Sequence, residues 1–239
     1  MLSLPRYRHD PDGTHPPFLS PDYRSTRVRA PLHAPVDLPQ RLTEVTGPVL
    51  GHERVGELDH DLTRQHDDEP QGQRIIVHGQ VRDGDGRPVP NTLLEVWQAN
   101  AAGRYRHAID RWPAPLDPNF TGLGRAMTDA EGRYRFVTVR PGAYPWGNHD
   151  NAWRPAHIHF SAFGQAFTQR LVTQMYFPDD PLFGQDPIFN SVPDPAARAR
   201  MIAAYDHEAT TPEWALGFRF DLVLRGREAT PFEDAHDDD

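Results

Sequence analysis

The chain has 239 residues, of which 37% are hydrophobic and 10% aromatic, so it can bury a sizeable core within a single domain. Its formal net charge of −9 argues against a nucleic-acid partner, because phosphate groups would be repelled. Cysteine is absent, which excludes disulfides, thiolate metal sites and a cysteine nucleophile, and the 25 prolines favour strands and turns over a helical bundle.

Residues 1–73 are expected to form an extended amino-terminal arm rather than a domain. Eight prolines recur between positions 5 and 39 among charged and polar residues, without a long hydrophobic period. Phe18, Leu19, Tyr23 and Val28 are scattered through this segment, which is more apolar than a solvated linker needs to be. We therefore expect the arm to pack along another surface, such as that of a partner subunit.

From residue 74 onward, short strand patterns alternate with turn-rich segments. The strand candidates, in chain order, are RIIVHGQV (74–81), TLLEVWQA (92–99), GRAMT (124–128), RYRFVTV (133–139), AHIHFSAF (156–163), TQRLVTQMYF (168–177) and one long strand over WALGFRFDLVLRG (214–226). Residues 129–132 provide a tight turn, and Gly164 lies near the bend between the fifth and sixth candidates.

One short helix is expected over DPAARARMIAAY (194–205), because Asp194 can cap it and Pro195 suits its first position. Short strands joined by glycine and proline turns predict a mostly β fold, a β-sandwich with one short helix. The chain would then divide into the arm, a β-sandwich domain at 74–227 and an acidic, solvated tail at 228–239.

No apolar run reaches membrane-spanning length, so we expect no membrane association. The segment MLSLPRYRHDPDG lacks the apolar stretch of a signal peptide. These features predict a cytoplasmic protein.

His157 and His159 alternate with Ile158 and Phe160, so the two imidazoles should share the strand face that points away from the core. The motif is short, and two ordinary surface histidines explain it about as well as a metal site does. Metal binding is the sharper hypothesis, because neutral imidazole is the commonest metal ligand and this spacing presents two of them.

The remaining ligands would decide which metal binds. The carboxylate that completes a ferrous facial triad does not accompany the histidines, since Asp150 is only a loop candidate. Tyr105 and Tyr144 surround the pair instead. A phenol with a usual pKa of about 10 ionises at neutral pH only beside a strong Lewis acid, for which ferric iron is the natural candidate. Taken singly, each tyrosine is more readily explained by ordinary packing.

Two further polar residues lie close to the histidines in the sequence. Arg154 precedes His157 by three residues and could stabilise negative charge on a metal-bound substrate, or simply form a surface salt bridge. Gln174 interrupts the apolar run LVTQMYF, so it lies either at an exposed edge or within a polar site that satisfies its amide.

Several motifs together resemble the intradiol ring-cleavage dioxygenases: GRYRH, PLDPNF, PGAYPW, WRPAHIHF and VTQMYF, in this order and at these separations. Within that family they most resemble the iron-bearing β chains that act on protocatechuate, and the likeness runs along almost the whole chain. The resemblance implies a β-sandwich of the intradiol dioxygenase type that holds a non-haem Fe(3+) with two tyrosinates and two histidines. The implied iron ligands are Tyr105, Tyr144, His157 and His159, and Tyr144 is the one that leaves the iron when a catechol binds.

The resemblance also implies roles for residues around the metal. Arg154 would stabilise the ketonised substrate, and Gln174 would be an active-site amide close to the ligands. Trp146 would line the substrate pocket, and Tyr23, from SPDYRST in the arm, would contact the substrate. The loop GNHDNA (147–152) is less familiar and carries no expectation about specificity.

The implied activity is cleavage of protocatechuate (3,4-dihydroxybenzoate) by O2 between its two hydroxyl-bearing carbons, which gives 3-carboxy-cis,cis-muconate. The resemblance further implies a partner, an α chain of similar fold, with which the chain forms α–β oligomers.

Two alternatives stay open from the sequence. The segment VHGQVRDGDGRPVPNTLLEVWQ also resembles the start of a transthyretin-like module, a non-catalytic binding domain in which the four candidate ligands would be dispensable. Within the dioxygenase family, a catechol or hydroxyquinol 1,2-dioxygenase is similar around the metal. Those enzymes usually carry a helical amino-terminal dimerisation region, whereas this chain begins with a proline-rich arm.

Overall fold

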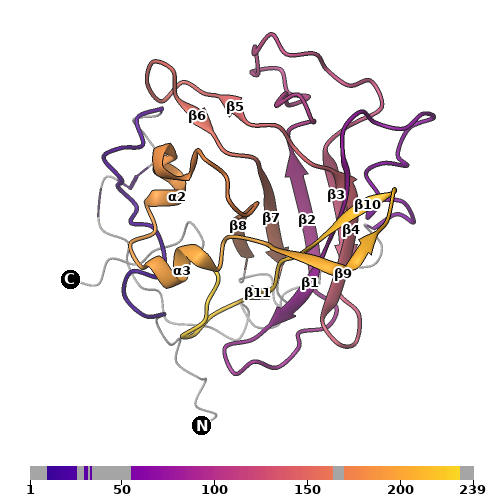
Figure 1. Cartoon of the computed structure of the whole chain (residues 1–239). Helices are drawn as coiled ribbons and strands as arrows, with labels where there is room; N and C mark the ends of the chain where they lie inside the picture. The colour runs from indigo at the N-terminus through magenta and orange to yellow at the C-terminus, as the bar shows by residue number, and fades with distance from the viewer. Residues whose placement is uncertain (1–9, 26–29, 32, 34–54, 164–169, 232–239) are drawn as a thin grey trace.

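The structure is a computed structural model that describes residues 10–25, 30, 31, 33, 55–163 and 170–231. Its main feature is a pair of β-sheets packed face to face (Figure 1). The prediction of a mostly β sandwich is confirmed.

One sheet is built around its long strand β1. Its members are β1 (Arg74–Arg82), β4 (Arg133–Val139), β9 (Ala204–Thr211), β10 (Ala215–Arg219) and β11 (Leu222–Val223). β1 pairs antiparallel with β4 on one side and parallel with β10 and β11 on the other, and β9 extends the sheet beyond β10.

The other sheet carries the histidines, and its strands run in the order β3-β2-β7-β8, all antiparallel. Its members are β2 (Leu93–Gln98), β3 (Leu123–Met127), β7 (His157–Phe163) and β8 (Arg170–Tyr176). A two-stranded hairpin of β5 (Tyr144–Pro145) and β6 (Trp153–Arg154) precedes β7 and lies at one end of the sandwich (Figure 1).

The core lies between the two sheets, where alternate residues of the strands face inward. Its largest fully buried apolar members include Ile75, Leu94, Phe136, Ile158 and Phe160. The predicted tight turn at 129–132 is also present. The Asp129 carboxylate accepts the backbone N–H groups of residues 131 and 133, and Gly132 takes the positive φ of +70° that the turn requires.

The predicted helix over 194–205 was too long, because only α3 (Pro195–Ala199) is helical. Its start is as expected, with the Asp194 side chain accepting the backbone N–H of Ala196 at 2.9 Å. Its end is set by tertiary pairing: Met201 and Ala203 exchange backbone hydrogen bonds with Tyr176 at the end of β8. A 3-10 turn, η2 (Phe183–Gln185), and a second short helix, α2 (Pro187–Asn190), were not predicted.

The single late strand predicted over 214–226 is divided into β10 and β11. The break falls at Phe220 and Asp221, where the Asp221 carboxylate, rather than a backbone carbonyl, accepts the N–H of Gln80 at 3.0 Å. The Phe220 carbonyl turns instead to the hydroxyl of Tyr134. The alternation of apolar and polar residues in this segment does not reveal that a carboxylate replaces a backbone carbonyl in the hydrogen-bond ladder.

The described parts of the arm pack against the chain itself. Leu62 is fully buried in the core, and Asp61 forms a bridge to Val137 of β4. Near the amino terminus, Gly13 accepts the backbone N–H of Asp194 at the start of α3. The apolar position Val28, the bend at Gly164 and the acidic residues 233–239 lie outside the described residues.

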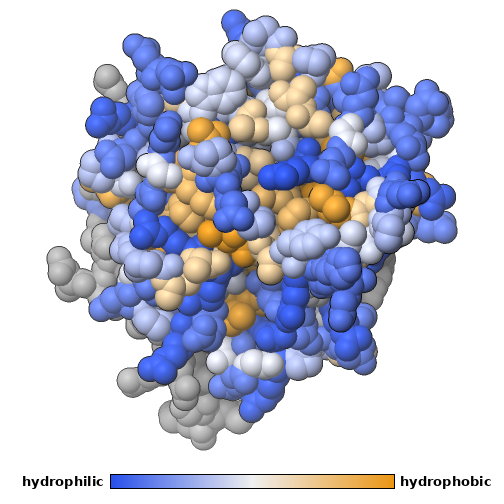
Figure 2. Space-filling view, in the orientation of Figure 1, coloured by the Kyte–Doolittle hydropathy of each residue, from blue (hydrophilic) through white to orange (hydrophobic). Residues whose placement is uncertain are grey.

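The tail expected to be solvated from residue 228 is not solvated at its start, because Ala229 and Thr230 are buried and Thr230 donates its backbone N–H to the carbonyl of Val223. None of the helices formed by the described residues has the length and apolar character that crossing a bilayer would require. On the face seen in Figure 2, apolar side chains gather near the centre and hydrophilic ones border them.

Candidate metal centre and active site

The alternation in β7 places its two histidines as predicted. Ile158 and Phe160 lie in the core, and His157 and His159 share the opposite face with ring centroids 4.8 Å apart. That face does not open to solvent at His157, whose exposed fraction is 1%. Tyr144 of β5 and Tyr176 of β8 pack against its ring, so His157 is part of a buried polar site and not of the solvated surface, and His159 beside it is half-buried.

Two tyrosines reach the histidines from separate loops. Tyr144 comes from β5, where it pairs with Arg154 of β6. Tyr105 follows Gly103, which has a φ of +76° and lies so close to the Ala143 carbonyl that a Cβ atom would come within 2.2 Å of it. Because only glycine fits there, the GRYRH loop can close on β5, and the two tyrosine rings meet edge to face with centroids 5.3 Å apart.

The polar atoms of these rings converge. The Tyr144 hydroxyl lies 3.2 Å from Nε2 of His157, and the ring centroids of Tyr105 and His159 are 6.5 Å apart. The buried hydroxyl of Tyr105 has no hydrogen-bond partner among the described residues. A buried oxygen left in this way is expected to have a partner that the protein itself does not supply.

The surroundings of both histidines favour the neutral imidazole, which is the form that can bind a metal ion. Nδ1 of His157 donates to the Pro155 carbonyl at 2.7 Å, which leaves the lone pair of Nε2 directed toward Tyr144. The His159 ring stacks face to face on Trp97, with centroids 4.8 Å apart and planes within 3°. Burial and then the neighbouring Arg154 lower the pKa of His157 well below its usual value and that of His159 to about 3.

The residues present fit a hard metal ion. Among the described residues, no group of three or more histidine, cysteine, aspartate or glutamate side chains could hold a metal, so a site here needs oxygen donors of another kind. Tyr105 and Tyr144 provide two phenol oxygens beside the two imidazoles. Burial, followed by the nearby Tyr144, raises the pKa of Tyr105, so a strong Lewis acid is needed to ionise it.

Arg154 is buried beside the histidines, with 3% of its surface exposed. Its Nη2 donates to Oε1 of Gln174 at 2.6 Å, to the Tyr176 hydroxyl at 2.9 Å and to the Asp186 carboxylate at 2.9 Å. Nη1 lies 3.3 Å from Nε2 of His157. The salt bridge is therefore buried rather than on the surface, and Gln174 is part of a polar site rather than at an exposed edge.

This network keeps the guanidinium charged next to the candidate ligands. Burial alone would lower the pKa of Arg154, but Tyr176 and Asp186 beside it more than offset that effect and raise the pKa. A fixed positive charge in a buried site interacts strongly with any negative charge that develops nearby.

A cavity of about 920 Å³ opens beside the candidate ligands. Tyr105, Tyr144 and His159 line it together with Trp146, whose ring also lies 5.6 Å from the guanidinium carbon of Arg154. Tyr23 packs against Trp146 with ring centroids 5.3 Å apart. Four of the eight predicted site residues thus line this cavity. Tyr23, Arg154 and His157 contact these lining residues, and Gln174 joins the group through Arg154.

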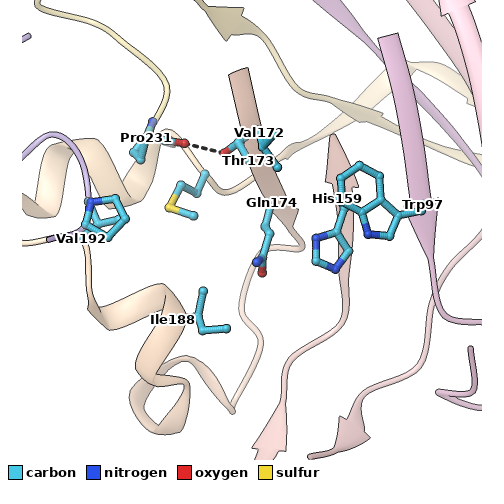
Figure 3. A pocket seen from close by; sticks show the side chains of 10 residues that line it. Trp97, His159, Val172, Thr173, Gln174, Ile188, Val192 and Pro231 are labelled. Atoms are coloured by element: carbon cyan, nitrogen blue, oxygen red, sulfur yellow. Dashed lines mark hydrogen bonds between the residues drawn. The ribbon is translucent and has the colours of Figure 1, made fainter. Parts of the chain in front are cut away.

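His159 also faces a second, smaller cavity, of about 170 Å³, between the sheet and the helices. In Figure 3 the stacked pair of Trp97 and His159 lies on one side of it, and Gln174 projects from β8 toward Ile188 of α2. Thr173 closes one end through its hydrogen bond to the Pro231 carbonyl.

Comparison with known protein families identifies the chain. A family model described as "Dioxygenase" matches residues 45–226, and one described as "Protocatechuate 3,4-dioxygenase beta subunit N terminal" matches residues 7–41. The chain belongs to the intradiol dioxygenase family. Membership in this family rejects the reading as a non-catalytic transthyretin-like module.

Individual relatives agree with this assignment. The chain is similar to the protocatechuate 3,4-dioxygenase beta chain of Burkholderia cepacia, at 59% identity over 92% of this chain and 94% of that one. It is 32% identical to the protocatechuate 3,4-dioxygenase alpha chain of Pseudomonas putida over 68% of this chain and 77% of that one. Among solved structures, 3-chlorocatechol 1,2-dioxygenase from Rhodococcus opacus 1CP superimposes with a TM-score of 0.55 at 27% identity and covers 72% of this chain and 67% of that one.

Three residues of this dioxygenase site were missed by sequence reasoning. Tyr176 follows Gln174 by two positions and so shares its strand face, a signal that was available. Asp186 precedes Pro187 just as Asp194 precedes Pro195, but this helix-start signal gives no hint of the contact with Arg154. Trp97 could be placed against His159 only once the register between β2 and β7 was known.

Proposed function

We propose that the chain is the iron-bearing β chain of a protocatechuate 3,4-dioxygenase, which uses O2 to open protocatechuate to 3-carboxy-cis,cis-muconate. The observation that carries this proposal is the convergence of two tyrosines and two neutral histidines at one cavity, in a chain so similar to a relative of that name. The chain is 59% identical to the protocatechuate 3,4-dioxygenase beta chain of Burkholderia cepacia over nearly the full length of both chains, and this favours protocatechuate as the substrate over catechol or hydroxyquinol.

In this proposal Fe(3+) is held by Tyr105, Tyr144, His157 and His159. When bound, ferric iron supplies the Lewis acidity that ionises the phenols and attracts the two catechol oxygens, and the electronic coupling that allows O2 to attack the ring. The depressed pKa values of the histidines mean that protons do not compete for their nitrogens at neutral pH.

Tyr144 has a second task in the proposal, as a base. Its hydroxyl lies in the cavity beside His157, and its ring is held edge to face against Tyr105. A phenolate displaced by the substrate would take one catechol proton at its own oxygen.

Arg154 stabilises the negative charge that moves onto the substrate ring. Its position does not depend on the substrate, because Asp186, Gln174 and Tyr176 already hold Nη2. Such a preorganised charge needs little reorganisation during the reaction. Trp146 lines the pocket, and its buried indole N–H has no hydrogen-bond partner among the described residues. Tyr23 contacts the substrate from the arm side of Trp146.

We further infer that the chain assembles with an α chain into α–β oligomers. Its 32% identity to an alpha chain supports this, since partners that share a fold commonly pair through pseudosymmetric interfaces. We place the complex in the cytoplasm, which suits a chain that has no cysteine and so needs no oxidising compartment.

The proposal is tested by producing the chain together with an α chain, loading the complex with iron, and recording O2 uptake and product mass with protocatechuate, catechol and hydroxyquinol. We expect one O2 consumed per protocatechuate and a ring-opened tricarboxylate product, with much slower turnover of the other two. A folded, iron-loaded complex that prefers catechol or hydroxyquinol, or consumes no O2, would refute the assignment.

A further inference from the structure

Asn148 lies in the loop between β5 and β6 and is buried, with 6% of its surface exposed. Its neighbours Gly147 and His149 to Asn151 are exposed, so this burial is a property of one side chain and not of the loop. An amide has an acceptor oxygen and a donor nitrogen, and burial requires partners for both.

Both ends of the Asn148 amide find partners in the arm. Nδ2 donates to the carbonyl of Asp22 at 2.9 Å, and Oδ1 accepts the backbone N–H groups of Arg24 and of Ser25, the latter at 3.1 Å. The bonded groups flank Tyr23 on both sides and lie 123 to 126 positions earlier in the chain. The Asn148 side chain therefore ties the backbone on both sides of Tyr23 to the β5–β6 loop.

Tyr23 in turn supports a wall of the cavity. Its ring packs on Trp146, which precedes Asn148 by two residues and lines the cavity together with Tyr105 and Tyr144. The Trp146 ring also contacts the guanidinium of Arg154. The indole is thus held by one contact from the arm and one from the buried arginine.

We propose that Asn148 is a positioning residue for substrate binding, which clamps residues 22–25 of the arm so that Tyr23 keeps Trp146 in place as the cavity wall. The position of this wall sets the space beside the metal ligands, and hence which ring-substituted catechol fits. The inference rests on the proposed function for its choice of substrate, but the clamp itself is independent of that choice.

The effect of losing the clamp differs from that of losing a catalytic group. Without the Asn148 side chain, three backbone groups of the arm lose their partners, and the segment around Tyr23 loses these bonds to the β5–β6 loop. His157 and Arg154 keep their own anchors, the Pro155 carbonyl and the Asp186 carboxylate. Binding of the substrate should therefore weaken while the chemical step is largely preserved.

The kinetic test uses Asn148→Ala and Asn148→Asp in the iron-loaded α–β complex. Loss of the buried hydrogen bonds in Asn148→Ala is expected to raise KM for protocatechuate about tenfold, with kcat little changed. Asn148→Asp keeps the two acceptor contacts but places its second carboxylate oxygen against the Asp22 carbonyl, so it should also raise KM. His149→Ala is the matched control, because the side chain of that exposed neighbour bonds the carbonyl of Asp150 within the loop and not the arm, among the described residues.

Two further readouts separate a clamp from a general structural role. Amide hydrogen exchange at Arg24 and Ser25 should be faster in Asn148→Ala than in the parent protein. Tyr23→Ala should raise KM as Asn148→Ala does, and the double variant should be no worse than either, because the two residues act as one unit.

An unchanged KM in Asn148→Ala, equal amide protection in the two proteins, or additive effects in the double variant would overturn the inference. The exchange measurement needs no turnover. If the parent complex failed to cleave protocatechuate but the variant's amides exchanged faster, the proposed function would fail and the clamp would stand.

Discussion

The carboxylate of Asp186 accepts a hydrogen bond from Arg154 at 2.9 Å, and both side chains are almost wholly buried. The same carboxylate caps α2 by accepting the backbone N–H of Ile188 at 3.1 Å. Asp186 therefore joins the start of a helix to the guanidinium beside the candidate metal ligands. Removing one partner of a buried ion pair leaves the other charge buried without compensation, which is strongly destabilising. This contact is therefore central to the site.

We expect Asp186→Asn to lower the free energy of unfolding by about 3 kcal/mol, because it leaves the Arg154 charge buried without a counter-charge. Turnover should fall as well, while iron remains bound. Asp194→Asn is the matched control, since Asp194 caps α3 in the same way without touching Arg154, and it should cost less than about 0.5 kcal/mol because asparagine caps a helix nearly as well as aspartate. Equal losses in the two variants, measured by urea unfolding, would show that only helix capping is involved.

Arg154→Ala should retain iron but lower kcat by a factor of about 100 to 1,000, because the site loses the positive charge that stabilises the reacting ring. Arg154→Lys keeps a charge and fills the space better, but cannot reproduce the three contacts of Nη2. We expect it to fold and to remain well below the parent in kcat. Metal analysis and steady-state kinetics check both variants, and a near-normal kcat in either would remove Arg154 from its proposed role.

Tyr144→Phe should change the visible spectrum of the iron-loaded protein and slow catechol binding, because it removes one phenol oxygen and the proposed base. Tyr205→Phe, on the exposed side of β9, provides the control. Stopped-flow absorbance under anaerobic conditions measures both effects. An identical spectrum in the iron-loaded Tyr144→Phe protein would exclude Tyr144 as a ligand.

The metal-free protein should lose stability as the pH falls. Burial and Arg154 lower the pKa of both histidines, that of His159 to about 3, whereas the unfolded chain titrates near about 6.5. Between these values the unfolded state binds more protons than the folded state, so the free energy of unfolding is fully present above about pH 6.5 and decreases below it.

We expect Tm of the chelator-treated protein to fall between about pH 7.5 and about pH 5, and the fall to be smaller in a His157→Gln, His159→Gln variant. Thermal unfolding followed by circular dichroism tests this. The same pH profile with and without the two histidines would show that other groups control acid stability.

The sequence was most informative within strands, where the alternation of side chains between two faces decides which residues enter the core. The alternation around His157 and His159 correctly placed both imidazoles on one face, because Ile158 and Phe160 must enter the core. Tyr105 could be identified as a candidate ligand only from the resemblance of its motif to a known family. Nothing in its local sequence links it to His157 and His159, which lie more than fifty positions later.

The features that sequence reasoning missed depend on contacts between distant segments. The helix after Asp194 ends early because Met201 and Ala203 pair with Tyr176, and the late strand breaks because the Asp221 side chain bonds to Gln80. The burial of Asn148 in a polar loop likewise becomes understandable only once the arm is seen to lie against that loop.

We propose that Tyr105, Tyr144, His157 and His159 hold ferric iron which binds a catechol. A visible absorption spectrum of the iron-loaded α–β complex, recorded before and after anaerobic addition of protocatechuate, tests this. We expect a broad tyrosinate-to-iron charge-transfer band that shifts when protocatechuate is added. A folded complex that stays colourless after reconstitution with iron, or whose band is unaffected by protocatechuate, would contradict it.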